Sequence, residues 1–430
     1  MKVCVLGIWH LGSVASACLA ELGFQVTGVD EDAARVEALN NGHAPLFEPD
    51  LDELLAKGLA AGRLSFVTDV SEGVAGADYV LIAYDTPVDD RDEVDLSGLF
   101  AAARAAAPHL AADATIVVSS QVPVGTCERL AEAVRETNPA VEFAIGCVPE
   151  NLRLGQAVQR FMTPDFLVFG AASHERLEAL FAAIDAPKLR TDLRTAEMTK
   201  HAINAYLATS ISFINEIANL CDLVGADAFQ VAEALRLDSR TGSETPLRPG
   251  LAFGGGTLAR DMKALRGIGQ VHGYEPALIS GAIRVNERQN GTVLPRLKGV
   301  CKGLRGLTIG VLGLTYKPGT STIRRSPAME IIQALNAEGA AVKAYDPRAD
   351  EAELRPYRHL FVRYDDAYAV ADGSQALILT TGWPQFRELD FRRIRDLMGT
   401  PWLLLDANEM SRLGFIYQGI GRSRVPEAQR

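Results

Sequence analysis

The sequence lacks three features, and each absence argues against a class of protein. It has no CxxC pair and no tight cluster of cysteine and histidine, so we expect neither a disulfide framework nor a zinc site. It has no block of lysines and arginines, and its 43 basic and 54 acidic residues give a formal charge of −11. An acidic balance without basic blocks argues against nucleic acid or an anionic membrane as the main partner. No run approaches the roughly 20 apolar residues of a membrane span.

The cysteines that are present are scattered, which is typical of reduced thiols in a cytoplasmic protein. They are Cys4, Cys18, Cys127, Cys147, Cys221 and Cys301. With 48% apolar and 23% charged residues over 430 positions, the chain has the composition of a soluble globular protein of about two or three domains. Its first residues imitate a signal peptide, but Gly7, His10 and Gly12 interrupt the apolar run, so we expect a folded segment there.

The first part of the chain alternates apolar strands with helical stretches. Residues 1–6 form an expected strand, residues 12–22 have helical periodicity, and residues 24–29 form a second strand that ends at Asp30. This β-α-β unit is the opening of a doubly wound sheet. Further apolar strands are expected at residues 79–83, 115–119 and 142–146, so the region up to about Pro187 is expected to form one parallel-sheet domain.

The rest of the chain contains a long helix and then a second β-α-β opening. Residues 195–224 are helical without a clear break, and this segment would either link two domains or form a dimer seam. A strand at 307–312, a helix start at Ser326-Pro327 and a strand at 341–345 ending at Asp346 follow. The predicted fold class is therefore α/β, with two Rossmann-like doubly wound domains joined by a long central helix. The expected boundaries are 1–190, 191–295 and 296–430.

The loop after the first strand resembles a dinucleotide-binding turn with one irregularity. Gly7-Ile8-Trp9-His10-Leu11-Gly12 has the first and third glycines of GxGxxG, but Trp9 replaces the second. Asp30 follows about 20 residues later, where an acidic residue accepts the ribose hydroxyl and favours NAD by repelling a 2′-phosphate. By itself the loop fits equally well a tight turn that binds no cofactor.

Motifs along nearly the whole chain resemble those of the UDP-glucose/GDP-mannose dehydrogenase family, in the family's order. They are Val29-Asp30-Glu31-Asp32, Val36-Glu37-Ala38-Leu39-Asn40, Phe47-Glu48-Pro49, Thr86-Pro87 with Asp95-Leu96, Val122-Pro123-Val124-Gly125-Thr126, Pro149-Glu150 with Leu152-Arg153, Lys200 with Asn204, Phe213-Ile214-Asn215-Glu216, Phe253-Gly254-Gly255 with Asp261, Gly313-Leu314-Thr315-Tyr316-Lys317-Pro318, Arg324, Ser326-Pro327, Tyr345-Asp346-Pro347 and Gly419-Ile420-Gly421-Arg422.

The resemblance implies a reaction and its catalytic residues. The family oxidises the C6 alcohol of a nucleotide sugar to a carboxylate with two NAD, through a cysteine thioester. Lys200 and Asn204 match the pair that stabilises the oxyanion, and their spacing puts both on one helix face. Asp261 matches the family's catalytic aspartate and Glu150 its glutamate base. Taken without the resemblance, Lys200 and Asn204 would fit a solvated helix surface, and Glu150 a carboxylate at a helix N-terminus.

The resemblance also implies the binding residues and partners. Expected NAD contacts are Gly7, Trp9, His10, Leu11, Gly12, Asp30, Arg35, Thr86, Pro87, Thr126 and Arg324. Expected contacts to the nucleotide sugar are Leu152, Arg153, Phe253, Gly254, Gly255 and Lys317. Lys317 and Arg324 suit phosphate groups, although surface charges near a helix start are the alternative. A UDP-sugar substrate, a cytoplasmic homodimer or larger homo-oligomer and a role in polysaccharide biosynthesis are further expectations.

The chain departs from the family pattern at the nucleophile. Thr257 stands where the family has its cysteine, in Gly256-Thr257-Leu258-Ala259-Arg260-Asp261. A hydroxyl without a dedicated base is almost wholly protonated at neutral pH, so the covalent second oxidation is not expected. Gln121 replaces the threonine near the hydrolytic water, and Thr322 and Trp9 are further departures. Cys147, at the end of an expected strand, is a minor candidate for a substitute nucleophile, although a buried structural thiol is the commoner role.

These observations predict an NAD-dependent oxidoreductase that acts on the C6 alcohol of a UDP-glucose-type sugar and stops at the aldehyde. Three alternatives stay open. The hydrated aldehyde could be oxidised to the uronate without covalent catalysis, or transient oxidation could epimerise a sugar carbon. The third alternative is a non-catalytic protein that binds NAD or a nucleotide sugar, in which Trp9, Gln121 and Thr257 mark the decay of an enzyme.

Overall fold

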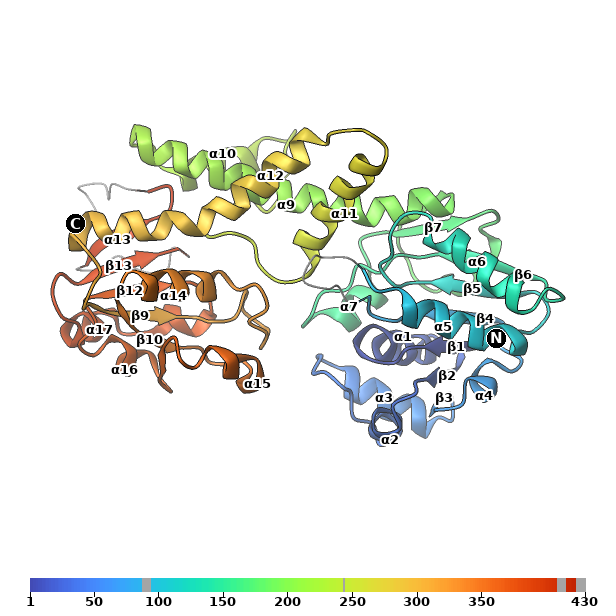
Figure 1. Ribbon diagram of the computed structural model, residues 1–430. Coiled ribbons are helices and arrows are strands. Elements are labelled where there is room, and N and C mark those ends of the chain that lie inside the picture. The colour runs from blue at the N-terminus through green and yellow to red at the C-terminus, as the bar shows by residue number, and fades with distance from the viewer. Residues whose placement is uncertain (87–93, 243, 408–414, 423–430) are drawn as a thin grey trace. The chain divides into compact units, whose positions relative to one another are not determined.

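The computed structural model describes residues 1–86, 94–242, 244–407 and 415–422. The chain divides into two compact units, Met1–Ala202 and Ile203–Arg430, which we describe one at a time. Each unit contains a twisted sheet with helices on both faces (Figure 1). The α/β class with Rossmann-like sheets and a long central helix is therefore confirmed.

The sheet of the first unit has eight strands in the order β3-β2-β1-β4-β5-β6-β7-β8. Its first six strands follow the order 3-2-1-4-5-6 of dinucleotide-binding sheets and are mutually parallel. The strands are β1 (Lys2–Leu6), β2 (Gln25–Val29), β3 (Leu64–Val67), β4 (Tyr79–Ile82), β5 (Ala114–Val118), β6 (Phe143–Cys147), β7 (Leu167–Ala171) and β8 (Lys188–Thr191). The expectation of a wholly parallel sheet is wrong, because β7 runs antiparallel to β6.

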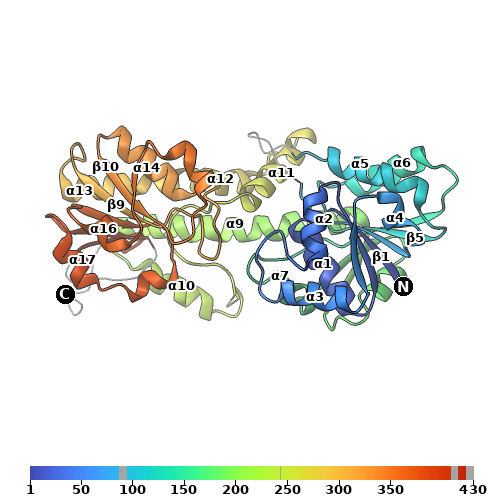
Figure 2. The same ribbon diagram turned by 90° about the horizontal axis from the view of Figure 1, so that it is seen from below.

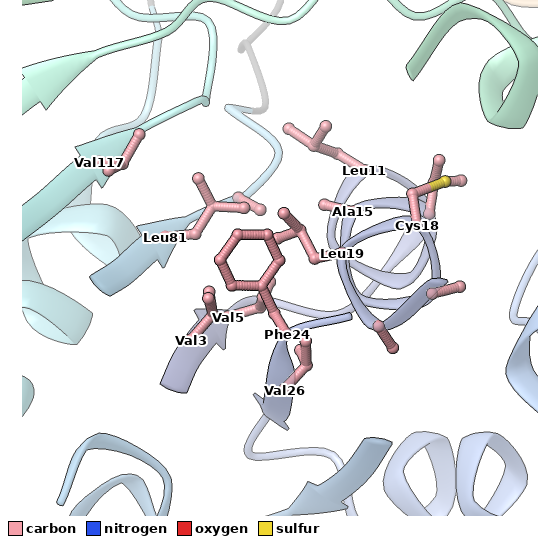
Figure 3. Close-up of a cluster of buried hydrophobic side chains, with 14 of the residues drawn as sticks. Val3, Val5, Leu11, Ala15, Cys18, Leu19, Phe24, Val26, Leu81 and Val117 are labelled. Atoms are coloured by element: carbon pink, nitrogen blue, oxygen red, sulfur yellow. The ribbon is translucent and has the colours of Figure 1, made fainter. Parts of the chain in front are cut away.

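Both faces of this sheet are buried, because successive side chains of a strand point to opposite faces. On β1, Val3 and Val5 pack into one core and Cys4 and Leu6 into the other. Figure 3 shows the first of these cores, where Val3 and Val5 lie opposite side chains of α1. The helices on that face are α1 (His10–Glu21), α2 (Ala33–Asn40), α3 (Leu51–Ala60), α7 (Ala157–Met162) and α8 (Glu175–Leu180). The opposite face carries α4 (Val70–Val74), α5 (Ser97–Ala106), the short turn Ala107–His109 and α6 (Thr126–Thr137).

The long helix predicted at residues 195–224 is α9 (Leu193–Val224), which is seen along its length in Figure 2. Among the described helices it alone is long and apolar enough to cross a membrane by length and composition. A core helix passes the same test, and in the second unit Ala205, Ile214 and Ala218 of α9 are buried in hydrophobic clusters. Packing of this kind is typical of a helix within a protein core.

The sheet of the second unit repeats the order of the first six strands of the first sheet. Its order is β11-β10-β9-β12-β13-β14, and every neighbouring pair is parallel. The strands are β9 (Thr308–Leu312), β10 (Ala341–Tyr345), β11 (Val362–Arg363), β12 (Ala376–Leu379), β13 (Leu403–Asp406) and β14 (Ile416–Gly419). The second Rossmann-like opening predicted from the sequence is confirmed.

Helices cover both faces of the second sheet as well. One core contains residues of α13 (Val293–Cys301), α14 (Pro327–Ala337) and α15 (Glu351–Leu354), and the other contains residues of α16 (Ala367–Ala371) and α17 (Phe391–Leu397). Three more helices precede this sheet in the chain: α10 (Ala228–Leu237), α11 (Thr257–Val271) and α12 (Ala277–Gln289). Short 3₁₀ turns occupy Asn290–Thr292, Arg355–Tyr357 and Pro384–Glu388.

Candidate functional site

The predicted dinucleotide turn lies between β1 and α1 and is very tight. Gly7 has φ +83°, and a Cβ atom there would meet the Tyr84 ring at 2.9 Å. A Cβ atom on Gly12 would lie 1.9 Å from the Gly7 carbonyl oxygen, so only glycine lets the helix approach the turn this closely. Trp9 precedes the helix with 45% of its surface exposed, so its indole is turned aside and does not fill the turn.

The start of α1 has no capping hydrogen bond from its N-cap side chain, Trp9. Among the described residues, no side chain caps the N-terminus of α1. The His10 ring, at the first helical position, instead contacts the buried carboxylate of Glu48 at 2.8 Å. An uncapped helix N-terminus favours an anion through its free N–H groups and its dipole.

Asp30 lies directly after β2, as the sequence predicts. Its Oδ2 accepts hydrogen bonds from the Ile8 N–H at 3.1 Å and from Arg35 Nη1 at 2.7 Å, and its Oδ1 accepts from the Asp32 N–H. The carboxylate is buried and tied to the turn that precedes α1. Burial raises the pKa of the nearby Tyr84 phenol to about 12, and the charges of Asp30 and Glu31 act in the same direction. The tyrosine is therefore neutral at physiological pH.

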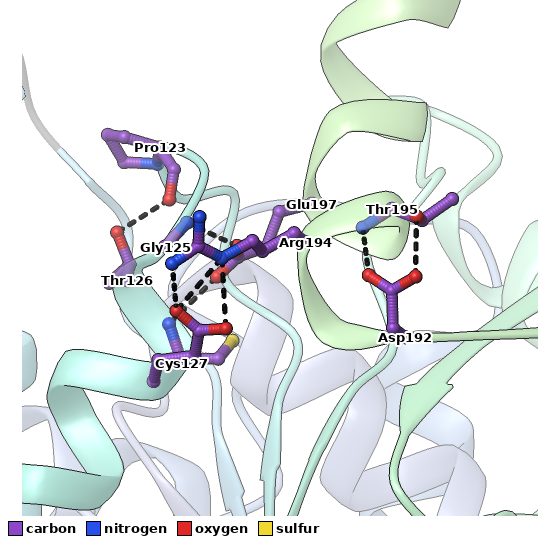
Figure 4. A network of polar contacts seen from close by, with 9 residues as sticks. Pro123, Gly125, Thr126, Cys127, Asp192, Arg194, Thr195 and Glu197 are labelled. Atoms are coloured by element: carbon purple, nitrogen blue, oxygen red, sulfur yellow. Dashed lines mark hydrogen bonds and ion pairs between the residues drawn. The ribbon is translucent and has the colours of Figure 1, made fainter.

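Two other predicted residues meet at the ends of β4 and β5. The Thr86 hydroxyl donates to the Gln121 carbonyl oxygen at 2.8 Å, and both side chains are buried. Thr126 opens α6, but it is only 1% exposed and its hydroxyl donates to the Pro123 carbonyl oxygen (Figure 4). The Thr126 side chain is therefore used within the protein.

The N-terminus of α6 is closed by a buried carboxylate from α9. Glu197 accepts from the Gly125 N–H at 2.6 Å and from the Cys127 N–H at 2.8 Å, as Figure 4 shows. Near it, Arg194 of α9 pairs with Glu128 of α6. Because a carboxylate already occupies this helix end, α6 offers no free anion site comparable to that of α1.

Lys200 and Glu150 form a cluster in the first unit. Lys200 Nζ donates to Asn151 Oδ1 at 3.2 Å and lies 3.8 Å from Glu150 Oε1. The other oxygen of Glu150 accepts from the Leu152 N–H at 2.6 Å, which fixes the orientation of the carboxylate. Glu150 lies in the loop after β6, and the next helix, α7, begins only at Ala157, so the alternative of a helix N-terminal carboxylate is wrong.

Asn204 lies one helical turn after Lys200 on α9 and pairs with Asp261 in the second unit. Asn204 Nδ2 donates to Asp261 Oδ2, and Arg260 Nε lies 3.7 Å from Asp261 Oδ1. Asp261 is fully buried, and Lys200 and Asn204 are 8% and 6% exposed. The alternative of a solvated helix surface is therefore wrong for both residues, since solvated side chains are mostly exposed.

Thr257 begins α11, after a glycine-rich turn that is packed within the second unit. A Cβ atom on Gly254 would lie 2.4 Å from the Arg325 carbonyl oxygen, and one on Gly255 would lie 2.8 Å from the Tyr316 ring. Asn286 clamps Phe253 by accepting from its N–H at 2.8 Å and donating to its carbonyl oxygen. The Thr257 side chain itself is exposed, one helical turn before Asp261 on α11.

Residues of this turn line a cavity of about 320 Å³ in the second unit, together with Lys263, Glu287, Arg325 and Glu330. Lys317 is partly buried beside the Tyr316 ring, at 5.7 Å, and Arg324 is exposed before α14. A Cβ atom on Gly256 would lie 3.7 Å from the Arg324 guanidinium, so Arg324 is close to the start of α11.

Three family models match the chain in the order of its segments. The NAD-binding domain of the UDP-glucose/GDP-mannose dehydrogenase family matches residues 1–185, its central domain matches 194–288, and its UDP-binding domain matches 310–412. The UDP-glucose 6-dehydrogenase TuaD of Bacillus subtilis is 37% identical, with 99% of this chain and 94% of that protein covered. The UDP-glucose 6-dehydrogenase of Rhizobium meliloti is 38% identical, with 98% and 100% covered.

Solved structures agree with these matches. A UDP-glucose dehydrogenase from the archaeon Pyrobaculum islandicum superposes with a TM-score of 0.90 at 35% identity, covering 98% of this chain and 97% of that one. The chain belongs to the UDP-glucose/GDP-mannose dehydrogenase family. It is accordingly an NAD-dependent oxidoreductase, and the resemblance found in the sequence is confirmed at the level of the family.

The first unit fits the cofactor of this family. The glycines that let α1 approach β1, the uncapped start of α1 and the Asp30 carboxylate supply the features that bind a dinucleotide. Pro87, also expected to contact NAD, lies outside the described residues. Leu152 and Arg153 follow Glu150 in the same loop, with Leu152 partly buried and Arg153 exposed.

The sequence interpretation missed several residues that shape this dehydrogenase. Glu48 was quoted only as part of a motif, yet it joins three segments by contacting His10 and accepting from the N–H groups of Gly155 and Ala157. Glu197 and Asn151 were not singled out. Neither gave a signal, since Glu197 lies between Arg194 and Lys200 in a charged stretch, where a carboxylate is usually a surface residue.

Proposed function

We propose that this protein oxidises the C6 primary alcohol of a UDP-glucose-type nucleotide sugar and releases the aldehyde. The names of the relatives support the substrate class, as does the match of residues 310–412 to the family's UDP-binding domain. One observation carries the chemical part of the proposal. Lys200 and Asn204 are buried one turn apart on α9, and each is held near a carboxylate, Glu150 and Asp261 respectively.

The chain's residues act on the oxygen of the alcohol. NAD bound by the first unit would supply the acceptor for the hydride from C6. The Lys200 ammonium and the second N–H of the Asn204 amide stabilise negative charge on the oxygen as the C–H bond breaks. Glu150 is partly exposed, so it is the group that takes up the hydroxyl proton and passes it to solvent. The alcohol thereby loses a hydride and a proton and becomes an aldehyde.

The second oxidation of the family reaction lacks its nucleophile here. Thr257 is an alcohol, and Asp261, one turn further on α11, accepts from Asn204 and is not a dedicated base for it. Cys147 is a poor substitute because it is only 1% exposed. Its neighbour Cys127 has its thiol pKa raised well above the usual value by a hydrogen bond with Cys147 and by burial. We therefore propose an atypical family member without covalent catalysis.

The remaining site residues are proposed as ligand contacts. NAD is held by Gly7, Trp9, His10, Leu11, Gly12, Asp30, Arg35, Thr86 and Arg324. Thr126 is not among them, because it is buried and its hydroxyl donates to the Pro123 carbonyl oxygen. The nucleotide sugar is held by Leu152, Arg153, Phe253, Gly254, Gly255 and Lys317. Gln121 faces Thr86 through its backbone carbonyl oxygen, and its side chain replaces the family's threonine. We retain the division into residues 1–190 for NAD, 191–295 for the central region and 296–430 for the nucleotide.

We also propose that the protein is a cytoplasmic homodimer joined along α9. Tyr206, Phe213 and Leu220 are exposed large apolar residues, and their seven-residue spacing places them in one stripe along the helix. A second copy of the helix would bury this stripe. Sedimentation of wild type and Phe213→Glu tests this proposal, since a charge in the stripe should release the monomer.

Product analysis tests the reaction. The purified protein is incubated with NAD and a panel of UDP- and GDP-sugars, and NADH is counted against the mass of the product. A loss of two hydrogens with one NADH per sugar supports the proposal. A carboxylate with two NADH indicates full oxidation through the hydrated aldehyde, an isomer without NADH indicates epimerisation, and no change with any sugar favours a binding protein.

Variants assign the roles. Lys200→Ala should lower NADH formation by about two or three orders of magnitude, as expected when a donor to an oxyanion is removed. Lys57→Ala is the matched control, because Lys57 is an exposed lysine paired with Glu21. Thr257→Cys should restore carboxylate formation. If it still yields only aldehyde, the arrest has another cause, and Gln121→Thr is the next variant to measure.

A further inference from the structure

Asn151 directly contacts the amine that the proposed reaction depends on. Its Oδ1 accepts a hydrogen bond from Lys200 Nζ at 3.2 Å, whereas the nearer oxygen of Glu150 lies at 3.8 Å, beyond hydrogen-bonding distance. Asn151 follows β6 and Glu150 in the chain and is partly buried. The motif shared with the family includes the residues on either side of it but not Asn151 itself.

A buried ammonium needs acceptors, because an N–H group removed from water without a partner is costly. Lys200 is 8% exposed, so bulk water does not surround its three donors. The amide oxygen of Asn151 supplies one acceptor at a fixed position. Glu150 supplies charge from a greater distance, since its second oxygen is held by the Leu152 N–H.

The other polar groups near Lys200 on α9 are already used. Glu197, one turn earlier, accepts from the N–H groups of Gly125 and Cys127. The His201 ring contacts the Val122 carbonyl oxygen at 3.0 Å. Asn204, one turn later, donates to Asp261, which lies near Arg260. None of these contacts takes the place of the hydrogen bond that Lys200 donates to Asn151.

We propose that Asn151 is a positioning residue that fixes the Lys200 ammonium in the orientation needed to stabilise the oxyanion. The inference rests on the proposed function, since it assigns Asn151 a role through Lys200. Asn151 acts on the amine and not on the sugar. Its loss should therefore weaken transition-state stabilisation more than the binding of cofactor or substrate.

Steady-state kinetics with paired variants test this role. Asn151→Leu should lower kcat by about tenfold, the scale of one hydrogen bond to a charged group, with the KM for NAD within about twofold of wild type. Asn151→Asp keeps the acceptor and should restore most of kcat. Asn41→Leu, at an exposed asparagine that follows α2, is the matched control and should leave both constants unchanged.

An unchanged kcat in Asn151→Leu would overturn the proposal, and so would a failure of Asn151→Asp to exceed Asn151→Leu. If Asn151→Leu does not fold, as judged by its thermal unfolding, Asn151→Ala takes its place, because it removes the acceptor without adding bulk. The expected kinetic result is the same for this variant.

A second measurement does not depend on turnover. The rate at which an amine-reactive acylating reagent modifies Lys200 is followed by peptide mass spectrometry. It should rise severalfold in Asn151→Leu and not in Asn41→Leu, because the amine loses its fixed acceptor. Equal rates would overturn the proposal. If wild type oxidises no nucleotide sugar, the proposed function fails, while the labelling rates still decide whether Asn151 holds Lys200.

Discussion

Asp30 directly follows β2 in the first sheet, and Asp346 directly follows β10 at the matching position of the second sheet. Asp30 accepts two backbone N–H groups and the Arg35 guanidinium, which is 27% exposed. Asp346 accepts six donors, all from buried or partly buried groups. They are the N–H groups of Leu314, Thr315, Arg348 and Ala349, the Thr315 hydroxyl and the Trp383 indole N–H.

The helices that follow the first strand of each sheet, α1 after β1 and α14 after β9, also differ at their N-termini. Only three residues separate α1 from β1, and α1 has no side-chain cap among the described residues. α14 begins only after the long segment from Gly313 to Ser326, and there the Ser326 hydroxyl accepts from the Ala328 N–H with Pro327 at the first position. A free helix start attracts an anion, whereas a capped one does not need a ligand.

The comparison teaches that one strand order serves two purposes. In the first unit, a carboxylate with an exposed partner and an open helix start can exchange internal contacts for ligand contacts. In the second unit, the corresponding carboxylate fixes Leu314 and Thr315 at the start of the long Gly313–Ser326 segment, which also carries Lys317 and Arg324. A shared fold therefore does not imply a shared ligand, because the ligand is decided by loops and side chains.

The largest expected effect comes from removing the Asp346 carboxylate, which accepts six hydrogen bonds. Asp346→Ala removes the acceptor that six donors share, of which only the Trp383 indole has a second acceptor, the Thr315 hydroxyl oxygen. We expect the free energy of unfolding to fall by at least about 3 kcal/mol. Calorimetry of the full chain measures it. Asp350→Ala is the control, because Asp350 only caps the exposed start of α15 and should cost about 1 kcal/mol. Equal losses in the two variants would contradict the structural role of Asp346.

A second prediction concerns the close contact in the first turn. Gly12→Ala forces a methyl group against the Gly7 carbonyl oxygen, so we expect a loss of about 1–3 kcal/mol and a large weakening of NAD binding. Gly98→Ala is the matched control, since Gly98 also lies in the first turn of a helix and has no neighbour within 4 Å of the added methyl. It should be neutral or slightly stabilising. Similar free energies of unfolding for the two variants would contradict the close contact between Gly12 and Gly7.

A smaller effect is expected at Asp30, and it should appear in binding more than in stability. Asp30→Ala removes the ribose acceptor, so the dissociation constant for NAD should rise about tenfold, the value of one or two hydrogen bonds. Titration calorimetry with NAD measures the dissociation constant. The melting temperature should fall less than in Asp346→Ala. The comparison of the two aspartates breaks down if Asp30→Ala binds NAD as tightly as wild type.

The smallest effect should follow alkylation of the cysteines. Burial raises the pKa of the Cys18 thiol to about 12 and that of Cys4 further still, so both stay protonated at pH 8. Since the thiolate is the nucleophile, brief exposure to iodoacetamide should spare them and modify the partly exposed Cys301 first. Peptide mass spectrometry gives the order, and NADH formation should persist. Inactivation matched to modification of Cys147 would instead assign that thiol a catalytic role.

Much of the fold could be predicted from local patterns. The strands at the centre of each sheet are continuous apolar runs, since both of their faces are buried, and this made β1, β4, β5 and β9 recognisable. Edge strands such as β3 and β8 are short and carry exposed side chains, so they gave no comparable signal. The reversed direction of β7 could not be predicted, because strand direction depends on the connection and not on composition.

In the candidate site, too, some features could be predicted from the sequence and others could not. The types and spacing of Lys200, Asn204, Asp261 and Glu150 could be read from the chain, as could the absence of cysteine at Thr257. The burial of Lys200 and Asn204 could not, because a lysine on a helix is usually solvated.

The sequence by itself determined the class of fold, the family and the residue types available for chemistry, because periodicity and motif spacing are local properties of the chain. Only the tertiary structure decided which polar groups are used within the protein and which stay open for a ligand. Asn151 meets Lys200 across 49 residues, and Glu197 closes the start of α6 across about 70, so these contacts exist only after the chain has folded. Hydrogen bonds over such separations depend on the packing of whole elements, and no local pattern encodes them.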